Sequence, residues 1–172
     1  MHTRMVEPGD ADALMEIYNP EVAETTVTFD LVTRTLDDQL AWIDEHRGAH
    51  PAIVAIDDEP GSGPLGSGGE SIVGFASLGT YRARAAYATT VESSVYVARS
   101  ARGRGVGSLL MLDLLALAKA GGFHSVIARI VGENKSSIEL HERCGFEFVG
   151  IEREVGRKHG RWLNVVELQI LL

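Results

Sequence analysis

The most informative segment of the chain is Arg102-Gly103-Arg104-Gly105-Val106-Gly107-Ser108, which lies between an expected strand that ends near Val97 and an expected amphipathic helix. Glycines allow successive backbone N–H groups to turn toward one point, because no Cβ obstructs the approach of a ligand. The start of the helix adds about half a positive charge, and Arg102 and Arg104 add full charges. Such a segment is expected to bind a pyrophosphate.

The spacing of the glycines excludes two common phosphate-binding motifs. A P-loop requires Gly-Lys followed by Ser or Thr, which is absent here, and a dinucleotide-binding fingerprint requires Gly-x-Gly-x-x-Gly, whereas these glycines fall at 103, 105 and 107. The remaining pattern, Arg-x-x-Gly-x-Gly, resembles the loop with which the GNAT superfamily of N-acetyltransferases holds the pyrophosphate of coenzyme A. A glycine-rich start of a helix that binds no ligand is the alternative.

The hydrophobic pattern predicts strands that alternate with helices. Strands are expected over residues 1–6, 52–56, 72–78, 91–97, 125–131, 146–154 and 162–171, and helices from about residue 11 and over 36–47, 105–120 and 134–143. Pro20 is expected to disturb the first helix, and residues 57–71 are expected to form a flexible hairpin loop. This order predicts one α/β domain over residues 1–172, with a mixed sheet. The resemblance implies the GNAT fold, in which helices cover both faces of a mostly antiparallel central sheet.

Segments outside the loop extend the resemblance over nearly the whole chain. Ser94-Val95-Tyr96-Val97 matches the strand before the loop, and residues 134–146 match the later element that runs from an Asn to Gly-Phe. The most similar branch contains phosphinothricin acetyltransferase and its relatives that act on methionine sulfoximine and sulfone. The segments that resemble this branch are residues 16–19, 25–29, 84–87, 90–97 and 156–165. Two departures are Asn164, where relatives often carry Asp, and the insertion at 57–71.

The resemblance implies acetyl-CoA as the co-substrate and no metal. The residues expected to bind it come from the strand, the loop and the later element, and they are Val95, Tyr96, Val97, Arg102, Gly103, Arg104, Gly105, Val106, Gly107, Ser108, Asn134 and Ser137. The spacing of the histidines is not that of metal ligands. The single cysteine, Cys144, is expected to pack rather than to act as a nucleophile.

Acetyl transfer to an amine requires removal of a proton, because a free alkyl amine is mostly protonated at pH 7. Glu92 is the candidate base: it shares a strand face with Ser94 and Tyr96, and a carboxylate in such a run is either solvated or functional. A backbone N–H at or beside Val97 is expected to donate to the thioester carbonyl. His141 stands where many superfamily members use a tyrosine, and it is a candidate catalytic acid, a pantetheine contact or a structural histidine.

The resemblance also implies an acceptor and a partner. Arg84 and Tyr87 are expected to recognise the acceptor, because a guanidinium binds a carboxylate with two hydrogen bonds; a solvated loop is the alternative. Phe29 is expected to line the pocket or to pack in the core. The relatives are dimers, so a homodimer is expected in which Lys158 and Trp162 reach the site of the partner subunit. The expected reaction is direct transfer of acetyl to an amine of the phosphinothricin, methionine sulfoximine or methionine sulfone type.

Composition limits the other classes of function. A net charge of −8 over 172 residues argues against nucleic acid as a partner, and no apolar stretch approaches the roughly 18 residues that a membrane span needs. The N-terminus lacks a signal-peptide pattern, so a cytoplasmic protein is expected. Two alternatives stay open. One is acetylation of protein or peptide N-termini, which needs an open groove; the other is a non-catalytic sensor of acyl-CoA, which would not need Glu92.

Overall fold

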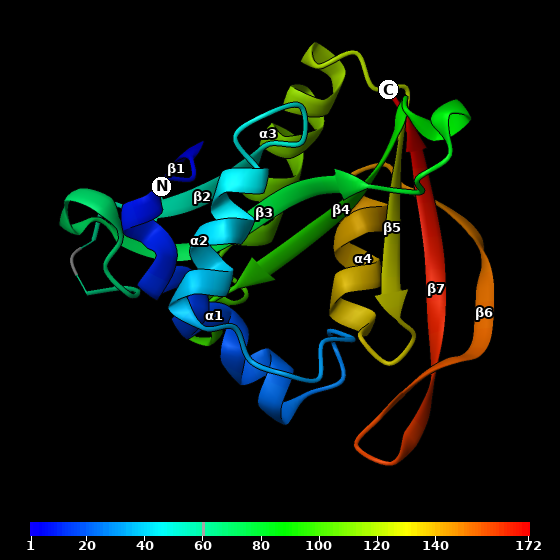
Figure 1. Cartoon of the computed structure of the whole chain (residues 1–172), viewed down its shortest axis with the longest axis horizontal. Coiled ribbons are helices and arrows are strands. Elements are labelled where there is room, and N and C mark those ends of the chain that lie inside the picture. Colours follow the sequence, from blue (N-terminus) through cyan, green and yellow to red (C-terminus); the bar gives the residue numbers. More distant parts are fainter. Residues whose placement is uncertain (60) are drawn as a thin grey trace.

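The computed structural model describes residues 1–59 and 61–172, and a seven-stranded sheet runs through them (Figure 1). The strands are β1 (His2–Met5), β2 (Ala52–Asp57), β3 (Ser71–Thr80), β4 (Thr90–Val97), β5 (Ser125–Val131), β6 (Glu147–Lys158) and β7 (Arg161–Leu171). Their order in the sheet is β1-β2-β3-β4-β5-β7-β6. β4 and β5 pair in parallel, and the other neighbours pair antiparallel. The expected mixed, mostly antiparallel sheet is therefore confirmed.

Helices cover both faces of the sheet. α1 (Ala11–Glu24) and α2 (Leu36–Glu45) lie in front of it in Figure 1, and α3 (Val106–Ala120) and α4 (Lys135–Arg143) lie behind it. Two neighbouring residues of β3 face opposite sides of the sheet and contact different helices. A Cβ added at Gly74 would meet Val106 and Leu110 of α3, whereas the ring of Phe75 packs against α1 and α2 on the other side. Short 3-10 helices link the elements: η1 (Pro8–Asp10), η2 (Ser67–Gly69), η3 (Ala85–Tyr87) and η4 (Arg99–Ala101).

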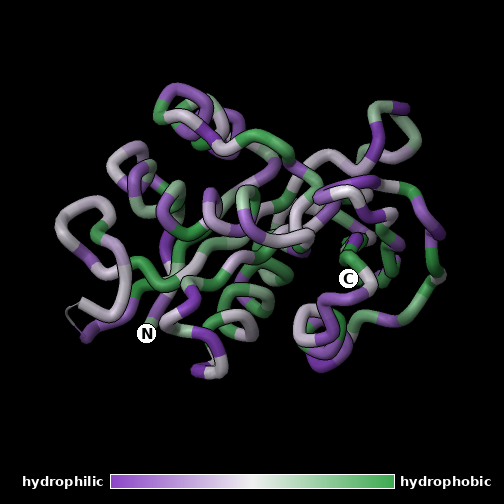
Figure 2. The backbone as a smooth tube through the Cα atoms, turned by 90° about the horizontal axis from the view of Figure 1, so that it is seen from below, coloured by the Kyte–Doolittle hydropathy of each residue, from purple (hydrophilic) through white to green (hydrophobic). Residues whose placement is uncertain are grey.

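The core lies between these helices and the middle strands. Every residue of β2 and the first eight residues of β3 are buried, which is why these strands are nearly continuous apolar runs rather than alternating ones. Figure 2 shows hydrophobic segments through the middle of the molecule and hydrophilic segments mostly at its outside. Among the described residues, every helix is too short or too polar to cross a bilayer.

The first helix continues past the proline that was expected to disturb it. Pro20 lies inside α1, which runs on to Glu24. The turn around the proline buries Tyr18, Glu21 and Val22, and the burial of this face offsets the cost of about 3 kcal/mol that an internal proline brings.

The expected flexible loop at 57–71 is instead anchored by its second half. It contains η2, and the backbone N–H of Ser67 donates to the fully buried carboxylate of Asp10 over 2.7 Å. Arg4 donates to the same carboxylate and to Glu70. The hydrogen bond from Ser67 and the ion pair of Arg4 with Glu70 therefore tie this half of the loop to the N-terminal segment. Pro60, which the expected loop includes, lies outside the described residues.

β6 extends past its expected end at residue 154, because it continues through a bulge, whereas β7 matches its expected bounds to within one residue. The register with β7 shifts between Glu152 and Gly156, and Glu154 takes a φ of 52°. The N–H of Glu154 donates to the amide oxygen of Asn164 over 2.8 Å. The asparagine that departs from the family pattern therefore supports the bulge, and an aspartate would accept the same hydrogen bond.

A gap between β4 and β5 is the feature that positions the site. The two strands pair only where Thr90–Glu92 meets Ser125–Ile127, and beyond Glu92 they diverge, as Figure 1 shows. The backbone of β4 from Ser93 onward therefore faces an opening rather than a neighbouring strand.

Candidate active site

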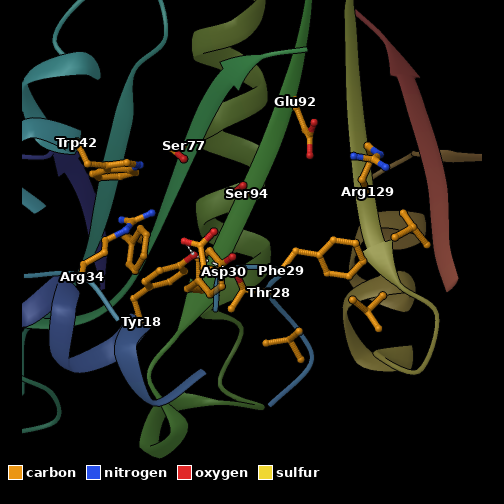
Figure 3. Close-up of a pocket in the computed structure, with 15 residues that line it drawn as sticks. Tyr18, Thr28, Phe29, Asp30, Arg34, Trp42, Ser77, Glu92, Ser94 and Arg129 are labelled. Atoms are coloured by element: carbon orange, nitrogen blue, oxygen red, sulfur yellow. Dashed lines mark hydrogen bonds between the residues drawn. The ribbon is translucent and has the colours of Figure 1, made fainter. Parts of the chain in front are cut away.

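Two hollows meet at the gap between β4 and β5. The first, here called the front pocket, lies on the face of α1 and α2 (Figure 3). It is lined by Tyr18, Val27, Thr28, Phe29, Asp30, Arg34, Trp42, Phe75, Ser77, Glu92, Ser94, Tyr96, Arg129, Val131 and Val165. The second, here called the rear cleft, runs along the start of α3 and beside α4. It is lined by residues 93–97, 101–103, 105–108 and 128–130, by Asn134, Ser136, Ser137, Leu140, His141 and Arg143, and by Glu21 and Val27.

The two hollows share Val27, Ser94, Tyr96 and Arg129. These residues come from the loop after α1 and from the strands on each side of the gap. A long ligand in the rear cleft can therefore present one end to a second molecule in the front pocket.

The glycine-rich loop has the backbone expected of an anion site. Gly103 and Gly105 take φ angles of 76° and 87°, in the left-handed region that favours glycine. α3 begins at Val106, so the first N–H groups of the helix have no partner within it. Gly107 fits close to α4, because a Cβ added there would come within 2.9 Å of the Cδ2 atom of Leu140.

The two arginines of the loop differ in their placement. Arg102 lines the rear cleft, and its guanidinium donates to the buried carboxylate of Glu21 over 2.9 Å. Arg104 does not line the cleft, and its guanidinium donates to Asp57 over 2.7 Å. The structure therefore places Arg104 as a tie between the loop and the end of β2, whereas the other loop residues expected to bind the cofactor line the cleft.

The backbone of β4 offers donors to the gap. The N–H of Ala98 donates to Val73 on the β3 side over 2.9 Å. Because N–H groups alternate in direction along a strand, those of Val95 and Val97 point the other way, into the gap.

The start of α4 contributes polar groups to the rear cleft. Asn134 caps the helix by accepting a hydrogen bond from the N–H of Ser137. The Nδ1 atom of His141 lies 2.8 Å from the carbonyl oxygen of Ser137, and because a carbonyl only accepts, Nδ1 carries the hydrogen. Nε2 is then an acceptor, and it is buried without a partner among the described residues. Burial lowers the pKa of His141, and the hydrogen bond to Ser137 offsets only part of this effect. The ring is therefore neutral at pH 7.

Glu92 lies where β4 and β5 part, at the last residue pair of their ladder. As strand alternation requires, it lines the front pocket together with Ser94 and Tyr96. Figure 3 shows Glu92 and Arg129 on neighbouring strands, with Arg34 and Trp42 on the opposite side of the pocket. Burial raises the pKa of Glu92, and the positive charge of Arg129 offsets part of that rise. A carboxyl with a raised pKa that faces a pocket is suited to proton transfer near neutral pH.

The residues expected to recognise the acceptor are not all brought to the pocket. Phe29 lines it, and its ring lies so close to β6 that a Cβ at Gly156 would come within 2.4 Å. Arg84 and Tyr87 lie at η3, are exposed, and line neither hollow. Lys158 is buried and donates to the carbonyl of Thr28 over 2.8 Å, whereas Trp162 is exposed.

Several pocket residues were missed by the sequence analysis. Tyr18 falls within residues 16–19, which resemble the related branch, but no role was expected of it. Its hydroxyl donates to Asp30 over 2.6 Å and lies 2.9 Å from the hydroxyl of Thr28. No sequence motif marks three other residues as part of the site, because their placement depends on contacts between distant segments. These residues are Arg34, Trp42 and Arg129. Within the described chain, no group of three His, Cys, Asp or Glu side chains is arranged to hold a metal.

The chain is similar to known acetyltransferases. The sequence profile of the acetyltransferase (GNAT) family matches residues 12–146. A phosphinothricin N-acetyltransferase of Streptomyces coelicolor is 41% identical over 165 residues, which cover 93% of this chain and 91% of that protein. An L-methionine sulfoximine/L-methionine sulfone acetyltransferase of Pseudomonas paraeruginosa is 37% identical over 165 residues, which cover 95% of this chain and 90% of that protein.

Solved structures extend the similarity to three dimensions. The crystal structure of a phosphinothricin acetyltransferase from Sinorhizobium meliloti, in complex with acetyl-CoA, has a TM-score of 0.88 with this chain. The two are 32% identical, and the match covers 99% of this chain and 87% of that one.

Proposed function

The chain belongs to the GNAT family of acetyltransferases, and from this we propose that it transfers acetyl from acetyl-CoA directly to the amino group of a small amino-acid-like acceptor. It is an N-acetyltransferase of the type that includes phosphinothricin and methionine sulfoximine acetyltransferases. The acceptor class and the direct transfer are the proposal. The observation that carries them is the meeting of the front pocket and the rear cleft beside Glu92.

Three features of the rear cleft fit acetyl-CoA. The left-handed glycines before α3 suit a diphosphate, and the N–H groups of Val95 and Val97 that face the gap suit the amide-containing pantetheine chain. The buried acceptor Nε2 of His141 has no partner among the described residues, so a donor group of a ligand would satisfy it. Bound acetyl-CoA supplies the acetyl group in activated form, as a thioester.

In this proposal Glu92 is the base that takes the proton of the acceptor amine. Its raised pKa brings the carboxyl closer to the pKa of an amine, which helps the transfer. Its position where the strands part places the carboxylate in the front pocket, on the side where the gap opens. The N–H groups of β4 that face the gap are placed to stabilise negative charge on the thioester oxygen. When the carbon–sulfur bond breaks, CoA leaves as a thiolate and takes up the second proton that the amine nitrogen loses.

We assign His141 to binding of the cofactor rather than to donation of a proton. Nδ1 carries the hydrogen and is engaged with Ser137, and the lowered pKa keeps the ring neutral. Nε2 therefore presents a lone pair to the cleft. Of the roles left open by the sequence, a contact for pantetheine fits this arrangement best.

Direct transfer is supported by the position of the only cysteine in the chain. Cys144 lines neither hollow, so it is not placed to form an acyl-enzyme. A sequential mechanism is expected, in which both substrates must be bound before acetyl moves, rather than the ping-pong pattern of a covalent intermediate.

Acetyl-CoA-dependent release of thiol should be fastest with free amino-acid analogues. The test compares three free acceptors, namely phosphinothricin, methionine sulfoximine and methionine sulfone, with tripeptides that begin with the same residues. We expect a kcat/KM at least about tenfold higher for the free analogues, because a pocket built for a carboxylated amine leaves polar groups unpaired with a peptide. Faster acetylation of the peptides would favour an N-terminal acetyltransferase, and CoA binding without turnover of any amine would favour a sensor.

We propose further that the chain acts as a homodimer, as its family resemblance implies. β6 forms one edge of the sheet and carries exposed apolar side chains, an arrangement that an unpartnered edge strand usually avoids. These side chains are Phe148, Val149, Ile151 and Val155, with Trp162 nearby on β7. A second copy that covers this edge would remove them from water.

Substitution of both Phe148 and Ile151 by Asp should convert the dimer to a monomer. Each new aspartate would place a carboxylate in the apolar interface between the two copies, where burying a charge is costly. Light scattering coupled to size-exclusion chromatography measures the mass directly. Leu112→Asp is the matched control, since Leu112 is an exposed apolar residue on α3, and it should leave the mass unchanged. A monomeric wild-type chain would contradict the proposal.

A further inference from the structure

The side chain of Arg34 is fixed inside the front pocket. Its guanidinium carbon lies 4.1 Å from the centre of the Tyr18 ring and 5.1 Å from that of Trp42. One terminal nitrogen donates to the amide oxygen of Gln39 over 3.1 Å, and Gln39 is fully buried. Figure 3 shows the guanidinium beside Trp42 and above Tyr18, directed into the pocket. Two aromatic faces and one hydrogen bond therefore set its position.

The backbone of Arg34 is held as well. Its N–H donates to the side-chain oxygen of Asn19 over 2.9 Å, and the side-chain nitrogen of Asn19 donates to its carbonyl over 3.0 Å. The next residue, Thr35, caps α2. Both ends of the arginine are therefore ordered before any ligand arrives, which lowers the entropy cost of binding one.

This guanidinium lacks a negatively charged partner. Within the described residues, no carboxylate lies within ion-pair distance of Arg34, whereas Arg129, the other arginine of the pocket, is paired with Glu152. Gln39 engages one of the five N–H donors of Arg34. The remaining donors are available to an anionic group of a ligand in the pocket, which would form charge-assisted hydrogen bonds with them.

We propose that Arg34 binds an anionic oxygen group of the acceptor and so holds the acceptor amine toward Glu92. This inference rests on the proposed function, and it names the charge that the pocket selects. A planar guanidinium suits a carboxylate or a phosphinate through two parallel hydrogen bonds. The anion is either the α-carboxylate of the acceptor or an acidic group on its side chain. The assignment replaces the one expected for Arg84, which lies outside the pocket.

Three acceptors separate the two sources of the anion. Methionine sulfone has an α-carboxylate and a neutral side chain. Its α-carboxamide has no negatively charged group. Phosphinothricin has both an α-carboxylate and a negatively charged phosphinate on its side chain. If Arg34 binds the α-carboxylate, Arg34→Gln should raise the KM of methionine sulfone about 10- to 100-fold, the factor for losing a hydrogen-bonded charge pair, and leave that of the amide unchanged. If Arg34 binds the side-chain anion, only the KM of phosphinothricin should rise by this factor.

Controls distinguish recognition from support of the fold. Arg34→Lys keeps the charge and should keep part of the preference for the anionic acceptor, while Arg47→Gln, at an exposed arginine outside both hollows, should change nothing. A purely structural Arg34 would shift the KM values of acid and amide equally, and this result would overturn the inference.

Calorimetry separates this inference from the proposed function. Binding of methionine sulfone and phosphinothricin is measured in the presence of CoA, without turnover. Loss of binding in Arg34→Gln, in a protein that acetylates neither compound, would support the anion site and refute the proposed reaction. Equal binding by wild type and variant, or no binding by either, would overturn the anion site.

Discussion

Glu92→Gln should lower kcat by about 10²- to 10⁴-fold, the range that general-base catalysis usually contributes. The variant keeps the size and hydrogen-bonding capacity of the side chain but removes the carboxylate that accepts the proton. The KM for acetyl-CoA should stay unchanged, because Glu92 does not line the rear cleft. Steady-state kinetics with a saturating amino-acid acceptor measure both quantities. A kcat equal to that of wild type would refute the assignment of Glu92 as the base.

The pH dependence gives this prediction a second readout. The pKa of Glu92 is raised, first by burial and with partial compensation by Arg129, so the carboxyl is protonated at a higher pH than an ordinary glutamate. The base is lost as the pH falls through that raised pKa. The acid limb of kcat/KM should therefore lie above the usual value of 4.5 for glutamate, and it should disappear in Glu92→Gln. Glu45→Gln, at an exposed residue outside both hollows, should keep the wild-type profile.

The parts of the site that the sequence predicts are those with a local signal. The phosphate loop is recognisable because its glycines and the start of its helix are adjacent in the chain. Glu92 can be placed on one face with Ser94 and Tyr96, because alternation in a strand needs no tertiary information. The resemblance built on these residues is confirmed by the comparisons with known acetyltransferases, and the fold it implied is confirmed as well.

The parts that the sequence misses depend on long-range contacts. Arg34 enters the pocket because Asn19, fifteen positions earlier, fixes its backbone, and because the rings of Tyr18 and Trp42 hold its guanidinium. Arg104 is turned away from the cleft by Asp57, which is the last residue of β2 and lies far from it in the sequence. The pairing of β4 with β5 ends after Glu92 and so opens the gap. This register depends on two distant segments, so the sequence of either strand alone does not predict it.

Arg84 shows how far a family motif can place a residue. A motif taken from a family implied a carboxylate-binding arginine, and the structure places that residue at an exposed turn. The chemistry expected of it, a guanidinium for a carboxylate, is available at Arg34 inside the pocket. The acceptor class therefore predicts the type of interaction, whereas the position of Arg34 in the front pocket comes from the structure alone.

Gly105→Val should raise the Kd for acetyl-CoA by a factor on the order of 100, the loss expected when one or two hydrogen bonds to a charged group are removed. Gly105 precedes the first residue of α3 and takes a φ of 87°, which valine adopts only under strain. Apart from its two chain neighbours, no described residue comes within 4 Å of a Cβ at this position. The added side chain would therefore occupy open space at the cleft, and the loop would have to relax away from the geometry that turns its N–H groups inward.

Gly122→Val is the control that isolates the phosphate site from backbone strain. Gly122 follows the other end of α3, takes a φ of 80°, and likewise has open space where a Cβ would be. Both variants should lose a similar amount of stability, about 1–2 kcal/mol for a side chain in the left-handed region, as thermal unfolding would show. Only Gly105→Val should lose affinity for acetyl-CoA in calorimetry, because only Gly105 lines the rear cleft.

The comparison of these two glycines bears on every step of the proposed reaction. The amides at the start of α3 are the part of the rear cleft that suits a diphosphate, and the position of the acetyl group beside Glu92 depends on that anchor. If both variants bound acetyl-CoA as tightly as wild type, the loop would not hold the diphosphate. Glu92 would then have no activated acetyl group in reach, and its raised pKa would reflect burial alone.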